Sequence, residues 1–221
     1  MKTFLALAIL LTGFSFAYAQ GEQAPLLEKE IQYKDWTYKN VRDEKEINLR
    51  DFAKNKKLVM VVYFAPWCPN WKTEAPIAQR LYDKYKANGF DVIGVGEYDT
   101  VAAMKTNLND QKITFPVVYE SDTKDAKQKT LHYEYRKAAG DTRGWGSPWN
   151  IFLEPKSLEK KGDVLTKKAF VVNGELIEAE VEKFVRQNLG LTAEETKADK
   201  AQNKIVEACD PEKKITTLKK P

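Results

Sequence analysis

The sequence predicts an α/β fold in which a central mixed β-sheet is flanked by helices. Two runs of strand length, residues 58–64 and 91–95, are apolar without alternation, which is typical of strands that are buried on both faces. Each run is followed by a segment with apolar residues at helical spacing, 77–85 and 101–108. Strand, helix, strand and helix in this order indicate parallel crossover connections.

The second half of the chain predicts two further strands and a closing helix. Residues 149–153 and 169–172 are short apolar runs, and the polar stretch 156–168 between them predicts an antiparallel connection. Residues 178–189 again have helical spacing, and Gly190 is placed to end that helix. The polar, lysine-rich segment 121–146 is expected to be a long, partly helical insertion.

Composition favours a globular protein and excludes several functional classes. The 221 residues are 43% hydrophobic and 31% charged, which allows one domain of moderate size with extensions. The net charge of +4 comes from interspersed signs, so no basic face for nucleic acid is expected. One His and two Cys far apart in the chain argue against a structural zinc site. No metal and no other cofactor is therefore predicted, and the oligomeric state is left open.

The chain divides into four segments. Residues 1–19 combine Lys2, an apolar run of about a dozen residues and Ala17-Tyr18-Ala19, as a secretory signal peptide cleaved after Ala19 does. Residues 20–34 read as an extended lead-in, 35–191 as the folded domain, and 192–221 as a polar, basic-ended tail that is helical or disordered. Because no other segment reaches the roughly 20 apolar residues of a membrane span, the mature protein is expected to be periplasmic or secreted.

Cys68 is the candidate reactive residue. It lies where the strand 58–64 gives way to a helix, and Pro69 suits the first turn of that helix. Unpaired N–H groups and the positive end of the helix dipole favour the thiolate, which is the nucleophilic form of sulfur. Pro76, eight residues further on, is expected to kink the helix.

With these motifs the chain resembles the TlpA/ResA-like branch of the thioredoxin fold, within the redoxin (AhpC/TSA) superfamily. The resemblance spans about 35–191 and rests on Tyr63-Phe64-Ala65-Pro66-Trp67-Cys68-Pro69, Glu74-Ala75-Pro76, Ile113-Thr114-Phe115-Pro116-Val117-Val118 and Gly146-Ser147-Pro148-Trp149-Asn150-Ile151-Phe152-Leu153. It implies a thioredoxin-like fold and three catalytic residues. These are Cys68 as the nucleophile, Pro148 in a cis peptide bond beside it, and Glu74 as a carboxyl group that influences thiol titration.

The sequence departs from this family at one decisive position. The family's redox unit is CxxC, whereas here the motif is Cys68-Pro69-Asn70-Trp71. No disulfide can form within the motif, so the mixed disulfide formed by Cys68 must be released by another thiol. The leading prediction is thiol–disulfide exchange through Cys68, with protein thiols and disulfides as partners and an external thiol or Cys209 as resolver.

Cys209 admits two roles that the sequence does not separate. An extended tail at about 3.3 Å per residue is long enough to bring Cys209 to the domain, so it is a candidate resolving thiol. A structural disulfide between Cys68 and Cys209 is equally consistent with the sequence, and it would consume the nucleophile.

Two rival functions use the same face. A redox-inactive binding or assembly protein would hold a peptide segment at an aromatic surface between Cys68 and Pro148. Its expected substrate-binding residues are Trp67, Trp71, Ser147 and Trp149, with Trp145 beside them. The alternative is that the tryptophans other than Trp67 are core or rim residues and that Trp71 fills the space of the missing sulfur. A peroxiredoxin-like peroxidase is less favoured, because peroxiredoxins place Thr or Ser where Ala65 stands. His132 is either a general base for Cys68 or a histidine satisfied by its surroundings.

Overall fold

The computed structural model describes residues 22–191; the expected signal peptide and the tail with Cys209 lie outside them. The strands are β1 (Gln23–Ala24), β2 (Leu27–Glu30), β3 (Thr37–Asn40), β4 (Glu46–Asn48), β5 (Leu58–Phe64), β6 (Phe90–Gly96), β7 (Val117–Tyr119), β8 (Trp149–Leu153), β9 (Lys168–Val172) and β10 (Glu175–Leu176). The α-helices are α1 (Leu49–Ala53), α2 (Pro69–Tyr85), α3 (Val101–Asp110), α4 (Leu131–Ala138) and α5 (Glu178–Leu189). Three short 3₁₀ helices are η1 (Lys86–Asn88), η2 (Lys124–Ala126) and η3 (Pro155–Ser157).

Eight strands form one mixed sheet in the order β2-β9-β8-β5-β6-β7-β3-β4. The adjacent strands β5, β6 and β7 are parallel, whereas β8 pairs antiparallel with both β5 and β9. Every residue of β5 and β6 is buried, which explains their unbroken apolar patterns. The predicted central mixed sheet, its parallel crossovers and the antiparallel β8–β9 connection are thus confirmed.

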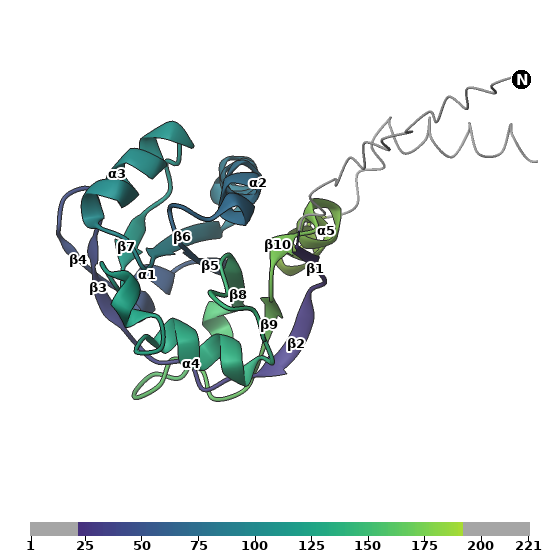
Figure 1. Cartoon of the computed structure of the whole chain (residues 1–221). Coiled ribbons are helices and arrows are strands. Elements are labelled where there is room, and N and C mark those ends of the chain that lie inside the picture. The colour runs from purple at the N-terminus through teal and green to yellow at the C-terminus, as the bar shows by residue number, and fades with distance from the viewer. Residues whose placement is uncertain (1–21, 192–221) are drawn as a thin grey trace, which may run out of the picture.

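Helices cover both faces of this sheet (Figure 1). On one face α2, α3 and α5 pack through residues such as Ala78, Leu108 and Val185. On the other face α1 and α4 contribute Leu49 and Tyr135 to a second core. The strand β5 supplies both cores from alternate residues, so the end of β5 is held from both sides.

The lead-in takes part in the sheets rather than merely preceding them. It is extended, as expected, and β2 forms an edge of the main sheet by pairing antiparallel with β9. The two-residue strand β1 pairs in parallel with β10. The folded unit therefore includes residues that the sequence assigns to the lead-in.

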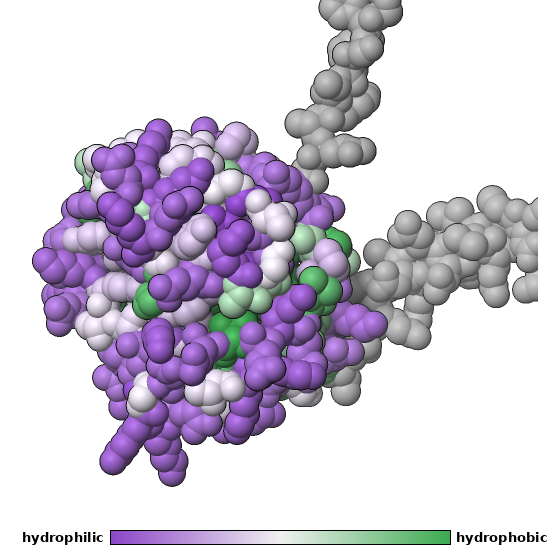
Figure 2. All heavy atoms as spheres, turned by 60° about the horizontal axis from the view of Figure 1, so that its bottom comes forward, coloured by the Kyte–Doolittle hydropathy of each residue, from purple (hydrophilic) through white to green (hydrophobic). Residues whose placement is uncertain are grey.

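The insertion 121–146 is partly helical, as predicted, and it is integrated into the domain. It contains η2 and α4, and Tyr135 and Ala139 are buried in the core on the α4 side of the sheet. The face in Figure 2 is mainly hydrophilic, with hydrophobic side chains in small groups. This exterior agrees with a chain in which 31% of the residues are charged.

Candidate functional site

Cys68 is the residue at which α2 begins. Its backbone is extended (φ −73°, ψ 124°), its N–H donates to the Ala65 carbonyl at 3.0 Å, and Pro69 is the first residue of the helix. No side chain caps this end, and the first turn has no acidic residue. The sulfur therefore stands near free helical N–H groups and the positive end of a 17-residue helix. The helix continues through Pro76 to Tyr85.

The segment around Pro148 faces the cysteine. The Ser147–Pro148 peptide bond is cis, as the resemblance implies. The Cys68 thiol donates to the Ser147 carbonyl oxygen at 3.3 Å, and the Ser147 hydroxyl accepts from the Ala65 N–H at 2.9 Å. Cys68 is a free thiol and retains 7% exposure. Two hydrogen bonds thus hold the two loops together with the sulfur at their junction.

Trp71 occupies the position of the missing second cysteine. Its side chain is fully buried and stacks on Phe64 with ring centroids 4.2 Å apart. Its indole nitrogen donates to Oδ1 of Asn107 at 2.9 Å, and Nδ2 of Asn107 donates to the Pro66 carbonyl at 3.1 Å. The indole is therefore a core residue that fixes the loop before Cys68. Asn107 has no signal in the sequence that would have identified it.

Glu74 lies on α2, completely buried. Its Oε2 accepts hydrogen bonds from the Leu176 N–H at 2.9 Å and from Nδ2 of Asn150 at 3.3 Å. Its Oε1 has no partner among the described residues. Burial raises the pKa of Glu74 to about 8, against the opposing effect of these hydrogen bonds. The carboxyl group is accordingly protonated at neutral pH.

The expected aromatic face is smaller than the sequence suggests. Trp71 and Trp149 are fully buried, and Trp149 donates to Asn173 at 2.8 Å, so neither is placed to contact a substrate at the surface. Hydrophobic packing against the sheet accounts for this difference. Trp67 and Trp145 are partly exposed and meet edge to face at 5.0 Å. The ammonium of Lys127 lies 4.2 Å from the Trp145 ring.

His132 is a satisfied interior histidine. Its Nε2 lies 3.1 Å from the Gly146 carbonyl, which can only accept, so Nε2 donates and Nδ1 accepts from the Tyr98 hydroxyl at 3.0 Å. Burial, assisted by the positive charges of Arg136 and Arg143, lowers the pKa of His132 to about 3. Both ring nitrogens are engaged away from the Cys68 sulfur, so of the two roles considered the satisfied one agrees with the structure.

A charged residue without a recognisable pattern in the sequence also reaches the site. Arg143, in the insertion, donates to the Pro148 carbonyl at 2.7 Å and to the Ser147 carbonyl at 3.4 Å. The sequence could not reveal this contact, because Arg143 lies in a polar, glycine-containing loop without a periodic pattern.

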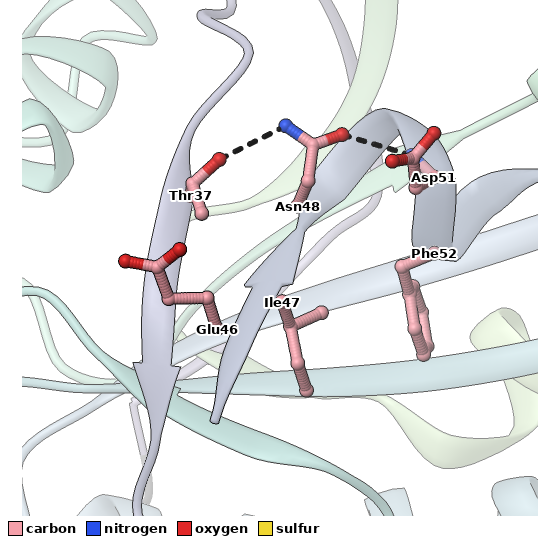
Figure 3. A pocket seen from close by; sticks show the side chains of 6 residues that line it. All are labelled: Thr37, Glu46, Ile47, Asn48, Asp51 and Phe52. Atoms are coloured by element: carbon pink, nitrogen blue, oxygen red, sulfur yellow. Dashed lines mark hydrogen bonds between the residues drawn. The ribbon is translucent and has the colours of Figure 1, made fainter. Parts of the chain in front are cut away.

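A surface hollow lies elsewhere, beside β3, β4 and α1 (Figure 3). Asn48 bridges two of its residues, because it donates to the Thr37 hydroxyl and accepts from the Asp51 N–H. Ile47 and Phe52 point in the same direction, away from these hydrogen bonds (Figure 3). These contacts cap α1, and nothing in them indicates a ligand.

Within residues 22–191, no group of three or more His, Cys, Asp or Glu side chains is arranged to hold a metal ion. In the same range, no helix has both the length and the apolar character that crossing a membrane requires.

Fold and site together define a thioredoxin-like domain with one cysteine at the start of its second helix. The model of the AhpC/TSA family matches residues 21–144, more than half of the chain, and the chain therefore belongs to this family. The predicted fold class and family are confirmed.

Curated relatives include thiol–disulfide oxidoreductases. The chain is 31% identical over 80 residues to the thiol-disulfide oxidoreductase ResA of a Bacillus cereus strain, which covers 36% of this chain and 45% of the relative. It is 26% identical over 139 residues to protein disulfide-isomerase 1 of Caenorhabditis elegans, covering 59% of this chain and 29% of the relative. The chain thus matches less than half of the length of each of these relatives.

Solved structures show the same fold at low identity. A secreted thiol-disulfide isomerase from Corynebacterium glutamicum superposes with a TM-score of 0.54 at 19% identity, covering 80% of this chain and 98% of that one. A protein disulfide isomerase candidate from Bacteroides thetaiotaomicron gives 0.53 at 16% identity, covering 76% and 94%.

Proposed function

We propose that this protein is a thiol-based redox protein that exchanges disulfides with protein partners through Cys68. The observation that carries the proposal is the position of the sulfur, at the start of α2 and 3.3 Å from the Ser147 carbonyl beside Pro148. The sulfur is thus placed at the N-terminal end of a helix, and its thiolate form is the attacking species in disulfide exchange. The similarity to ResA supports the same reaction class.

The reaction consists of two exchanges. Cys68 first loses its proton to solvent and attacks one sulfur of a substrate disulfide. The Sγ–S bond forms, the substrate S–S bond breaks, and the second substrate sulfur leaves as a thiolate that takes up a proton. A second thiol then attacks the mixed disulfide and releases Cys68. Because Trp71 is a buried indole, this second thiol comes from outside the motif, either from another molecule or from Cys209.

The proposed location is periplasmic or secreted, after removal of residues 1–19. The polar start, apolar run and Ala17-Tyr18-Ala19 site support it. A secreted thiol-disulfide isomerase among the proteins of the same fold is consistent with it. Disulfide substrates persist in such compartments.

The test is capture of the mixed disulfide. The mature chain, purified without reductant, is first mapped for a Cys68–Cys209 bond and then incubated with a peptide that contains a disulfide. We expect the wild type and Cys209→Ser to form an adduct on Cys68 faster than a model thiol does, and Cys68→Ser to form none at this position. A rate no faster than that of the model thiol would reject redox exchange in favour of the binding alternative. A Cys68–Cys209 bond that resists mild reductant would make Cys68 structural.

A further inference from the structure

The insertion 121–146 places a half-buried guanidinium group against the segment that faces the candidate nucleophile. The Arg143 side chain is only 18% exposed, and it donates to two successive carbonyl groups, Pro148 at 2.7 Å and Ser147 at 3.4 Å. The Ser147 carbonyl is also the acceptor of the Cys68 thiol, at 3.3 Å. One oxygen atom therefore links the sulfur to the cation.

Carboxylates hold the Arg143 guanidinium in this place. Asp141, whose side chain is 1% exposed, accepts from Nε at 3.1 Å and from Nη2 at 2.8 Å. Glu22, which immediately precedes β1, accepts from Nη1 at 3.3 Å. A planar guanidinium has several donors in fixed directions and can bind two carboxylates and two carbonyl groups at once, whereas the ammonium group of a lysine is not suited to this geometry.

The backbone that carries Arg143 is held by α4. Arg136 donates to the Arg143 carbonyl at 2.7 Å and to the Gly144 carbonyl at 3.1 Å. His132, one turn earlier on the same helix, donates to the Gly146 carbonyl at 3.1 Å. Three carbonyl groups of the loop thus point at two side chains of α4, and the loop enters Ser147 with a defined geometry.

The shared carbonyl has consequences for the reaction. In the thiol form, the sulfur donates to the Ser147 oxygen. When the proton leaves, the partial negative charge of this oxygen faces a thiolate, which is unfavourable. Arg143 opposes this effect, because its guanidinium donates a hydrogen bond to the same Ser147 oxygen and places a positive charge beside it.

We propose that Arg143 is a positioning residue for thiol exchange at Cys68, acting through the Ser147 carbonyl that its guanidinium holds. The assignment rests on the proposed function and deepens it. It gives the insertion a role, which is to supply the cation and the support that fix the segment facing the sulfur.

The test compares Arg143→Gln and Arg143→Lys in a Cys209→Ser background, where Cys68 is the only thiol. Two disulfide reagents are used, the neutral 4,4′-dithiodipyridine and the dianionic 5,5′-dithiobis(2-nitrobenzoate). Arg42→Gln is the matched control, because Arg42 also donates to two carbonyl groups, those of Ile113 and Phe115, in another loop. Circular dichroism establishes that each variant is folded.

We expect Arg143→Gln to slow both reagents about 10-fold, because the Ser147 carbonyl that faces the sulfur loses its charge-assisted partner. It should slow the anionic reagent further, because Asp141 and Glu22 then lack their cation. Arg143→Lys keeps the wild-type ratio of the two rates but remains slower with both reagents, and Arg42→Gln matches the wild type. Wild-type rates with the neutral reagent in Arg143→Gln would overturn the proposal. If Arg143→Gln does not fold, wild-type rates in Arg143→Lys overturn it instead. The rates of the Arg143 variants are compared with that of the Cys209→Ser parent, not with a model thiol. The role of Arg143 and the proposed redox function of Cys68 can therefore be rejected independently.

Discussion

The indole nitrogen of Trp71 donates a 2.9 Å hydrogen bond to the side-chain oxygen of Asn107. This bond connects α2 to α3, and the Asn107 amide extends the connection to the Pro66 carbonyl, two residues before Cys68. Both side chains are buried. Trp71 stands where a second cysteine would complete a dithiol. Its side chain instead has a structural role, because its hydrogen bond to Asn107 helps to fix the loop that precedes Cys68.

Trp71→Phe is expected to keep a ring against Phe64 and to leave the Asn107 oxygen without its donor. An unsatisfied buried acceptor costs about 1–3 kcal/mol, and we expect a loss of this size in the free energy of unfolding. Trp71→Ala should lose more, about 3–5 kcal/mol, because a cavity also forms. Urea denaturation measures both. Trp145→Phe, at a partly exposed tryptophan, is the control. Equal losses in Trp71→Phe and Trp145→Phe would show that the Trp71–Asn107 hydrogen bond contributes nothing to the free energy of unfolding.

Gly146 is expected to tolerate no side chain. Its φ is +63°, and a Cβ there would lie 2.3 Å from Cδ of Arg136. Gly162 has a similar φ of +73° and nothing within 4 Å of the added atom, so Gly162→Ala measures the backbone strain alone, about 1 kcal/mol. Gly146→Ala should cost clearly more and slow the reaction of Cys68, as measured by urea denaturation and by the dithiodipyridine assay. Equal costs in the two variants would mean that Arg136 moves freely and that the loop is not held as described.

The elements that local pattern predicted well are the ones that pack on the middle of the sheet. The run 58–64 coincides with β5 because a strand covered on both faces has no polar position to obscure it. The closing helix has the predicted bounds, Glu178–Leu189, because its apolar stripe and Gly190 agree. No local pattern predicts the short strands β3 and β4, of which β4 forms an edge of the sheet. They have only four and three residues, all exposed or half-buried, and only β3 alternates between the two.

The candidate site divides in the same way. Cys68 and Pro148 stand in motifs whose spacing carries information, and the structure brings Cys68 against Ser147. Arg143 and Asn107 reach the site through loop geometry and long-range packing, which leave no local pattern. The burial of Trp149 depends on the other elements of the core, so composition alone could not distinguish it from the partly exposed Trp67.

His132 is expected to remain neutral throughout the physiological range. Burial and the charges of Arg136 and Arg143 lower its pKa to about 3, and the Tyr98 and Gly146 contacts fit the neutral ring. Because it is the only histidine in the chain, its ring proton resonances are easily followed by NMR in an untagged protein. They should not shift between pH 8 and pH 5. A titration with a midpoint near the ordinary value of 6.5 would show that the ring is accessible and would reopen its role as a general base.

Glu74 is expected to make the protein less stable as pH rises. The pKa of this carboxyl is raised by burial from 4.5 to about 8 in the folded chain. Below pH 4.5 both states hold the proton and the stabilisation is complete. Between pH 4.5 and 8 the unfolded chain releases the proton and the folded chain retains it, so the free energy of unfolding falls by up to ~1.4 kcal/mol per pH unit. Above pH 8 the folded carboxyl ionises as well, and the slope disappears.

Glu74→Gln replaces the protonated carboxyl with a neutral side chain of similar shape and removes this contribution. The difference in free energy of unfolding between the variant and the wild type should therefore grow in favour of the variant from pH 5 to pH 8, as measured by urea denaturation at each pH. The other buried carboxyls with raised pKa values, Glu97 and Glu175, are present in both proteins, so their own contributions largely cancel in the difference. Parallel curves for the two proteins would mean that Glu74 is already ionised in the folded state, and that its unpaired oxygen is solvated.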